Sequence, residues 1–211
     1  ILTISWNNGA NPDFFAFGES RELRQVDKEY FAIETVGENY KLIEEQLPSS
    51  IESYQSTKDE KGNQYFCFYQ EGIIHGFDQN GKRILEWGAD EIGQGHPIYD
   101  IDYQFPDFLW LAFPTGQTVT QVSITDRKET YKIGEYTWDD KYDPLSYPES
   151  LFVKGKFVFI PNMGNNKLFR FDNETKELEL IETFEEKLWQ YETTDLGTFI
   201  VTDTGIYELE K

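Results

Sequence analysis

The sequence predicts an all-β chain that folds as one five-bladed β-propeller domain over residues 1–211. Three observations lead to this prediction. Aromatic residues, which favour strands, make up 17% of the chain. No long stretch has helical periodicity. A strand–turn–strand unit whose turn ends in glycine recurs five times, and its spacing matches the roughly 40–50 residues of a four-stranded blade.

The repeat is aligned on its glycine. Each copy has four mostly apolar residues, three turn-prone residues and a glycine, as in 30-YFAIETVG-37, 65-YFCFYQEG-72, 109-LWLAFPTG-116, 157-FVFIPNMG-164 and 198-TFIVTDTG-205. An alternating strand follows each glycine. The glycines lie 35, 44, 48 and 41 residues apart, whereas turns in a sandwich or barrel recur about every 8–12 residues. The spacing therefore favours blades over a sandwich or barrel.

Each blade is expected to contain four strands, which we call a, b, c and d in chain order. Strand b precedes the glycine and strand c follows it. Strand a is expected at residues 51–56, 98–103, 149–153 and 188–193, and strand d at 83–87, 129–133 and 177–181. The best helical segment, 183–191, reads equally well as a loop followed by a strand. The c–d turn at Asn80-Gly81 suits a tight hairpin that needs positive φ.

The ends of the chain are expected to meet in one blade. The last unit stops after strand c, so 1-ILTISW-6 would supply its missing strand d and remove an exposed sheet edge. The apolar run 14-FFAF-17 has no place in this scheme, and the first unit leaves little room for a strand d. Six blades, one of them degenerate, are therefore the alternative.

Three segments resemble known propeller repeats. The segment 198-TFIVTDTGIYELEK-211 resembles the repeat of bacterial sensor-type propellers, in which a Thr-Asp-x-Gly turn recurs. The segments 66-FCFYQEGIIHGFDQNGK-82 and 157-FVFIPNMGNNKLFRFDNETKEL-178 are similar to the NHL, quinoprotein-like and YVTN repeats. The resemblance is to an architecture that hosts ligand binding, scaffolding and several enzyme classes, so it implies a fold and not one function.

Charge limits the partners. Lys and Arg number 19 and Asp and Glu 39, which gives a net charge of −20. This charge disfavours nucleic acid and anionic membranes, and no apolar run is long enough for membrane insertion. A basic or mixed-charge protein, or a small polar ligand, is the expected partner of a monomeric chain. The single cysteine, Cys67, favours the cytoplasm, and secretion would require a removed N-terminal segment.

Antiparallel order places the b–c turns and d–a connections on one side of the blades, which we call the loop face. Binding residues concentrate on loops held by a rigid scaffold. The expected contacts on this face are His96, Trp138, Asp139, Asp140, Tyr142, Asn162, Asn165, Asn166 and Asp203. Gly164 itself is expected to serve backbone geometry.

Motifs for nucleotide binding and for nucleophilic catalysis are absent from the sequence, and no cofactor is expected. Calcium is a candidate ligand for the pairs Asp100 with Asp102 and Asp139 with Asp140. His75 is expected to be a partly buried strand residue, so a zinc site with His96 is not favoured.

The chain is therefore expected to be a non-catalytic binding module that recognises a protein through its loop face. Carbohydrate binding, at the central opening or at the connection 136–148, is the alternative. A glycoside hydrolase or lyase is the second alternative. It would use inward-pointing Asp100, Glu34 and Asp203, and it predicts raised carboxyl pKa values near the channel.

Overall fold

The computed structural model describes residues 2–7, 12–17, 23–26, 54–68, 72–92, 95–137, 144–194, 197–202 and 206–208. These residues form antiparallel sheets with few helical turns, which confirms the all-β prediction. The chain divides into two compact units, one with residues 1–51 and 193–198 and the other with residues 52–192 and 199–211. Each unit is described by itself below.

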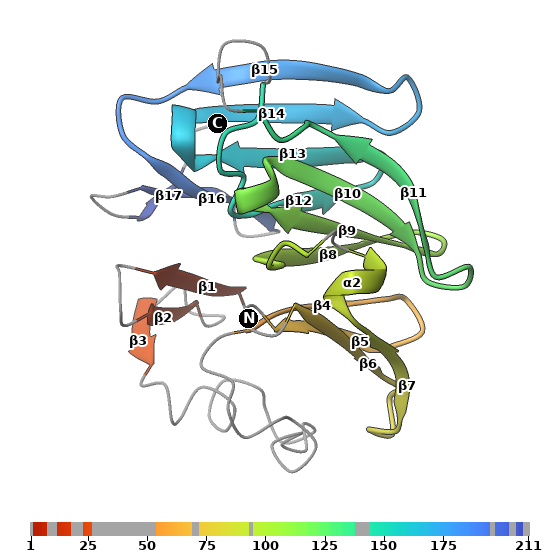
Figure 1. The fold of residues 1–211 in the computed structure, drawn as a ribbon. Helices are drawn as coiled ribbons and strands as arrows, with labels where there is room; N and C mark the ends of the chain where they lie inside the picture. The colour runs from red at the N-terminus through yellow and green to blue at the C-terminus, as the bar shows by residue number, and fades with distance from the viewer. Residues whose placement is uncertain are drawn as a thin grey trace. The chain divides into compact units, whose positions relative to one another are not determined.

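Five sheets follow one another along the chain (Figure 1). Sheet 1 contains β1 (Leu2–Asn7), β2 (Pro12–Phe17) and β3 (Leu23–Val26). Sheet 2 contains β4 (Tyr54–Lys58), β5 (Gln64–Phe68), β6 (Ile73–Phe77) and β7 (Arg83–Trp87). Sheet 3 contains β8 (Asp100–Gln104), β9 (Phe108–Phe113), β10 (Thr118–Ser123) and β11 (Lys128–Ile133). Sheet 4 contains β12 (Phe152–Lys154), β13 (Phe157–Asn162), β14 (Lys167–Asp172) and β15 (Glu177–Thr183). Sheet 5 contains β16 (Leu188–Thr194), β17 (Gly197–Thr202) and β18 (Ile206–Glu208).

Sheets 2, 3 and 4 each run a-b-c-d from one edge to the other, which confirms the strand scheme for these repeats. Residues 183–191 are a loop and a strand, because β15 ends at Thr183 and β16 begins at Leu188. The described helical elements are short: α2 (Ala89–Ile92), η2 (Pro114–Gly116) and η3 (Met163–Asn165). The first glycine unit, residues 30–45, lies outside the described residues.

The prediction that residues 1–6 complete the last sheet is wrong in this structure. The described strand order makes β1 an edge of sheet 1, where it pairs with β2, and gives sheet 5 three strands. The run 14-FFAF-17, which had no predicted partner, lies within β2. Pairing with a strand that starts five residues later closes a far shorter loop than pairing with the distant C-terminus, and short loops cost less entropy.

The apolar b strands are buried on both sides. On β9, Leu109, Leu111 and Phe113 pack with residues of sheet 2, while Trp110 and Ala112 pack with residues of sheet 4. Successive side chains of a strand point to opposite faces, so a strand that is covered on both faces needs an unbroken apolar run. This explains why the four residues that open each repeat are mostly apolar.

Cys67 and His75 also belong to this interior. Cys67 is buried between sheets, and burial raises the pKa of its thiol, as expected for a small core residue. The buried ring of His75 makes edge contacts with Phe68 and Phe77, at centroid distances of 5.3 and 6.2 Å. The structural interpretation of both residues is therefore confirmed.

The outer strand of each four-stranded sheet carries a β-bulge. The register with strand c skips Ile84 in β7, Thr130 in β11 and Ile181 in β15. Ile84 and Ile181 are 42% and 41% exposed. A bulge interrupts the ladder and twists the edge, which hinders pairing with another chain.

Candidate functional site

The loop face of sheet 3 is a turn held by the connections on either side of it. The imidazole of His96, from the connection before β8, lies against Gly116, and a Cβ at that glycine would approach the ring to 3.1 Å. His96 Nδ1 and Thr115 Oγ1 are 3.2 Å apart. From the connection after β11, the amide of Thr137 donates to Gln117 Oε1 at 3.0 Å. These contacts confirm that b–c turns and d–a connections share one face.

The corresponding turn of sheet 4 is held more tightly. The amide of Gly164 donates to the carbonyl of Ser146 at 2.8 Å, and the amide of Met163 donates to the carbonyl of Tyr147 at 3.1 Å. A Cβ at Gly164 would lie 2.4 Å from Ser146 Oγ and 2.6 Å from its carbonyl oxygen. Glycine is therefore required here by the close approach of the d–a connection.

The positive φ of these two turns falls on the residue after the 3-10 helix and not on the glycine. Gln117 has φ 54° and Asn166 has φ 59°, both in the left-handed region. Gly164 therefore serves backbone geometry, as predicted. The reason is the close approach of Ser146 and not a positive φ at the glycine. At the predicted c–d hairpin, Gly81 does take a positive φ of 78°.

Asn162 and Asn165 support the connection that precedes β12. Asn162 has no exposed surface. Its Oδ1 accepts from the amide of Ser146 at 2.8 Å, and its Nδ2 donates to the carbonyl of Pro144 at 3.0 Å and to Asn165 Oδ1 at 2.7 Å. Asn165 Nδ2 also donates to the carbonyl of Pro144, at 3.1 Å. The buried amide of Asn162 therefore has a structural role, because all its hydrogen-bonding atoms hold the loop.

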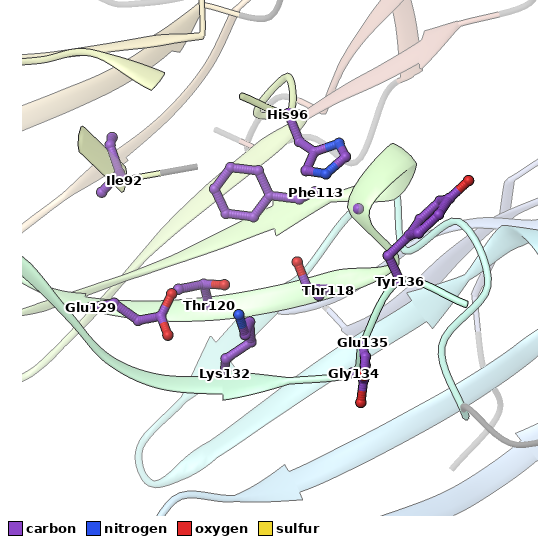
Figure 2. A pocket seen from close by; sticks show the side chains of 11 residues that line it. Ile92, His96, Phe113, Thr118, Thr120, Glu129, Lys132, Gly134, Glu135 and Tyr136 are labelled. Carbon is purple, nitrogen blue, oxygen red and sulfur yellow. The ribbon is translucent and has the colours of Figure 1, made fainter. Parts of the chain in front are cut away.

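A pocket of about 360 Å³ opens beside sheet 3. Its lining comes from α2 and the connection after it, from β9 and its turn, and from β10, β11 and the segment after β11. The lining residues are Ile92, His96, Phe113, Gly116, Thr118, Thr120, Glu129, Lys132, Gly134, Glu135 and Tyr136. Figure 2 shows Thr118 and Lys132 projecting from neighbouring strands on the side where His96 and Phe113 lie. We call this space the β10–β11 pocket.

Two aromatic rings stand at one end of the β10–β11 pocket. The rings of His96 and Tyr136 lie 6.4 Å apart between centroids at an angle of 27°, which is a stacked arrangement. Tyr136 is 46% exposed. The hydrogen bond between His96 and Thr115 fixes the orientation of the imidazole. The pocket therefore offers an oriented ring face to a ligand.

The pocket includes one of the predicted contact residues. His96 lies in it, and Tyr136 opens the connection 136–148 that was expected to bind. Thr118, Glu129 and Lys132 were missed, because polar side chains on strands c and d read as an ordinary solvated face. The expected contacts Trp138, Asp139, Asp140, Tyr142 and Asp203 lie outside the described residues, as does Glu34.

A second group of polar residues links the a strands. Asp102 of β8 accepts from Thr57 Oγ1 of β4 at 2.8 Å and from the amide of Val153 of β12 at 2.7 Å. Asp100 accepts from the amide of Leu151, which precedes β12, at 2.8 Å. Side-chain oxygens therefore connect three successive sheets along strands that share no backbone ladder in the described strand order.

The acids near these a strands have raised pKa values. Burial raises the pKa of Asp100 to about 8, and the neighbouring carboxylates of Asp102 and Glu192 act in the same direction. Burial raises the pKa of Glu192 and of Glu149 to about 7, and it also raises the pKa of Asp102. Several of these acids thus exchange protons near neutral pH.

The described part of the chain holds no cluster of metal ligands. There, no three His, Cys, Asp or Glu side chains gather closely enough to hold a metal ion. Asp100 and Asp102 instead direct their oxygens to backbone amides and to Thr57. Among the same residues, no helix has the length and apolar character needed to cross a membrane.

Comparison with known proteins shows a fold and no family. No family model matches the chain, and no curated protein matches it. The solved structure of Kuenenia stuttgartiensis hydrazine synthase is similar, with a TM-score of 0.56 and 15% identity over 70% of this chain and 40% of that one. The computationally designed Ika4 protein is similar with a TM-score of 0.54 and 11% identity, over 75% of this chain and 92% of that one. The designed Ika8 protein has a TM-score of 0.52 and 12% identity, over 74% and 45%.

At these identities the likeness concerns the fold alone. The chain spans 40% of the matched hydrazine synthase chain and 45% of the matched Ika8 chain. Together with the successive four-stranded sheets, the likeness fits a repeat-based all-β architecture.

Proposed function

We propose that the chain is a non-catalytic β-propeller that recognises a protein partner through its loop face. The contacts between β4 and β8 and between β8 and β12 support treating sheets 2, 3 and 4 as consecutive blades with strand a innermost. The five glycine turns predict five blades. The separate sheet 1 would raise the number to six if residues 1–26 form a blade of their own.

The observation that carries this proposal is a pair of exposed tyrosines on clamped loops. Tyr136 and Tyr147 are each 46% exposed and lie in the same d–a connection. The carbonyl of Tyr147 accepts a hydrogen bond from the amide of Met163. The amide of Thr137, the residue after Tyr136, donates to the side chain of Gln117. Tyrosines on a rigid support provide large contact area at little entropic cost and are enriched among binding hot spots.

The charge of the chain indicates the partner's surface. A net charge of −20 attracts basic or mixed-charge proteins and repels acidic ones. Long-range steering of this kind weakens when salt screens the charges, with a Debye length of about 8 Å at physiological ionic strength. Association with the partner should therefore slow as salt is added.

The test is to place a photo-crosslinking amino acid at Tyr147 and, as a control, at Phe105. Phe105 is 72% exposed but lies in the a–b turn on the opposite face. We expect a specific protein adduct from position 147 and none from 105. Tyr147→Ala should then weaken binding about tenfold or more, as for a hot-spot tyrosine, while Phe105→Ala leaves it unchanged. Equal crosslinking from both faces, or binding indifferent to salt, would contradict the proposal.

A glycoside hydrolase or lyase is the second candidate, and the raised acid pKa values favour it. A carboxyl group with a pKa near 7, as at Glu192, can act as a general acid at neutral pH. Both oxygens of Asp100 already accept backbone amides, which leaves Glu192 as the better proton donor. Aryl glycoside substrates would be hydrolysed by the native chain, and Glu192→Gln would slow the reaction about 100-fold or more. Absence of turnover across a substrate panel would remove this candidate.

A further inference from the structure

We infer that the β10–β11 pocket binds one ring of a neutral, hydroxyl-rich ligand, such as a sugar residue. The inference concerns a site that shares Tyr136 with the loop face but excludes Tyr147, and it holds whether or not a protein binds that face. Its volume of about 360 Å³ falls within the range of about 300–1,000 Å³ found for small-ligand sites.

The charges in the pocket argue for a neutral ligand. Glu129 and Glu135 provide carboxylates, and Lys132 provides an ammonium group. A cationic ligand would meet Lys132, and an anionic ligand would meet the two carboxylates. A hydroxyl group donates to a carboxylate and accepts from an ammonium group, so a polyhydroxylated ligand can use Glu129 and Lys132 together.

Hydroxyl groups add further complementarity on β10. Thr118 and Thr120 both line the pocket, and Thr120 is only 2% exposed. Each threonine hydroxyl can donate one hydrogen bond and accept others, as can each hydroxyl of a sugar. The two threonines lie on the same side of the strand because their positions differ by two.

The rings of His96 and Tyr136 would face the apolar side of the ligand ring. Sugar rings present C–H groups on one face, and an aromatic surface buries these groups without losing hydrogen bonds. The imidazole of His96 is held by its hydrogen bond to Thr115. Tyr136 lies two residues after Gly134, and the backbone at Gly134 packs so closely on Gln117 that a Cβ there would lie 2.3 Å from the Gln117 carbonyl oxygen. The platform is therefore built before the ligand arrives, which reduces the entropic cost of binding.

The experiment titrates the full chain with glucose, galactose, mannose and N-acetylglucosamine, followed by NMR chemical-shift changes. N-acetylarginine amide and inorganic phosphate serve as the cationic and anionic probes. We expect at least one neutral sugar to shift resonances of pocket residues. We also expect Tyr136→Ala to weaken its binding about tenfold, equivalent to the loss of one aromatic contact.

Two matched variants separate the pocket from the rest of the surface. Lys132→Met should weaken sugar binding, whereas Lys128→Met, on the same strand but outside the pocket lining, should not. Tyr147→Ala has the same exposure as Tyr136 and should leave sugar binding intact while reducing protein binding. The two proposals can therefore fail separately.

Four results would overturn the inference. They are binding of no sugar, binding only of the arginine derivative, binding only of phosphate, and sugar binding that Tyr136→Ala and Lys132→Met leave unchanged. Unaltered melting temperatures of the variants would show that a loss of binding is local.

Discussion

The carboxylate of Asp102 accepts a hydrogen bond from the amide of Val153 at 2.7 Å and thereby joins β8 to β12. Its other oxygen accepts from Thr57 on β4 and from the amide of Tyr103. One side chain thus serves as an acceptor for groups on three strands. Because these strands belong to different sheets, we expect Asp102 to contribute to cohesion between sheets 2, 3 and 4.

Asp102→Ala should destabilise the chain. Removing the carboxylate deprives the partly buried Val153 amide and Thr57 hydroxyl of their acceptor, and a fully buried donor left unsatisfied costs about 1–3 kcal/mol, which sets the upper limit for each. Urea unfolding measures the change. Asp126→Ala, in the exposed c–d turn of sheet 3, is the matched control and should change stability by less than about 0.5 kcal/mol. Equal effects of the two substitutions would refute the assigned role.

Stability should fall as the pH rises from about 4 toward 8. The pKa of Asp100 is about 8 in the folded chain against an ordinary value of 3.8. Between these values the folded state holds a proton that the unfolded state has lost, so raising the pH favours unfolding. Glu192 and Glu149, with pKa values of about 7, act in the same direction. The lowered pKa values of Asp78, Asp107 and Asp172 take effect below about pH 4, outside this window.

Unfolding free energies measured from pH 5 to 8.5 test this slope. Asp100→Asn should flatten it without abolishing it, since the two glutamates still titrate. A slope of opposite sign, or one identical in Asp100→Asn, would show that the buried acids do not govern the pH dependence.

Gly164→Ala should destabilise the loop face. The added methyl would collide with Ser146 Oγ and with its carbonyl oxygen, and overpacking of this kind costs about 1–3 kcal/mol. Gly88→Ala is the control, because the nearest atom to its Cβ is a glutamate oxygen 3.8 Å away. Thermal unfolding compares the two. A melting temperature for Gly164→Ala as high as for Gly88→Ala would mean that the connection readily moves.

Gln104→Met should destabilise sheets 3 and 4 together. Gln104 Oε1 accepts from Trp110 Nε1, Gln121 Nε2 and Asn173 Nδ2 at 2.8, 2.9 and 3.1 Å. Methionine fills a similar volume but leaves the buried indole donor of Trp110 unpaired, at a cost of about 1–3 kcal/mol. Chemical unfolding followed by Trp fluorescence measures the loss. If Gln104→Met has the same urea midpoint of unfolding as the unsubstituted chain, the polar network contributes no net stability.

The thiol of Cys67 should be inert in the native chain. It is 1% exposed and burial raises its pKa, so little thiolate forms and reagents cannot reach it. Ellman's reagent at pH 8 should label the chain only after denaturant is added. Rapid labelling under native conditions would indicate that the sheet 2 interior opens.

The strands of sheets 2, 3 and 4 and their order could be predicted from the sequence, because local patterns encode them. An apolar run such as 109-LWLAF-113 marks a strand covered on both faces, and turn residues such as Gly81 mark a reversal. Such signals act over a few residues and need no knowledge of distant contacts.

The partner of β1 and the need for glycine at position 164 depend on contacts that the sequence pattern does not reveal. The sequence analysis assigned residues 1–6 to the last blade, whereas they pair with β2, which closes a shorter loop. Gly164 is required by Ser146, eighteen residues earlier. The β10–β11 pocket likewise draws His96 and Lys132 from separate segments, and contacts between distant segments leave no periodic trace in a single sequence.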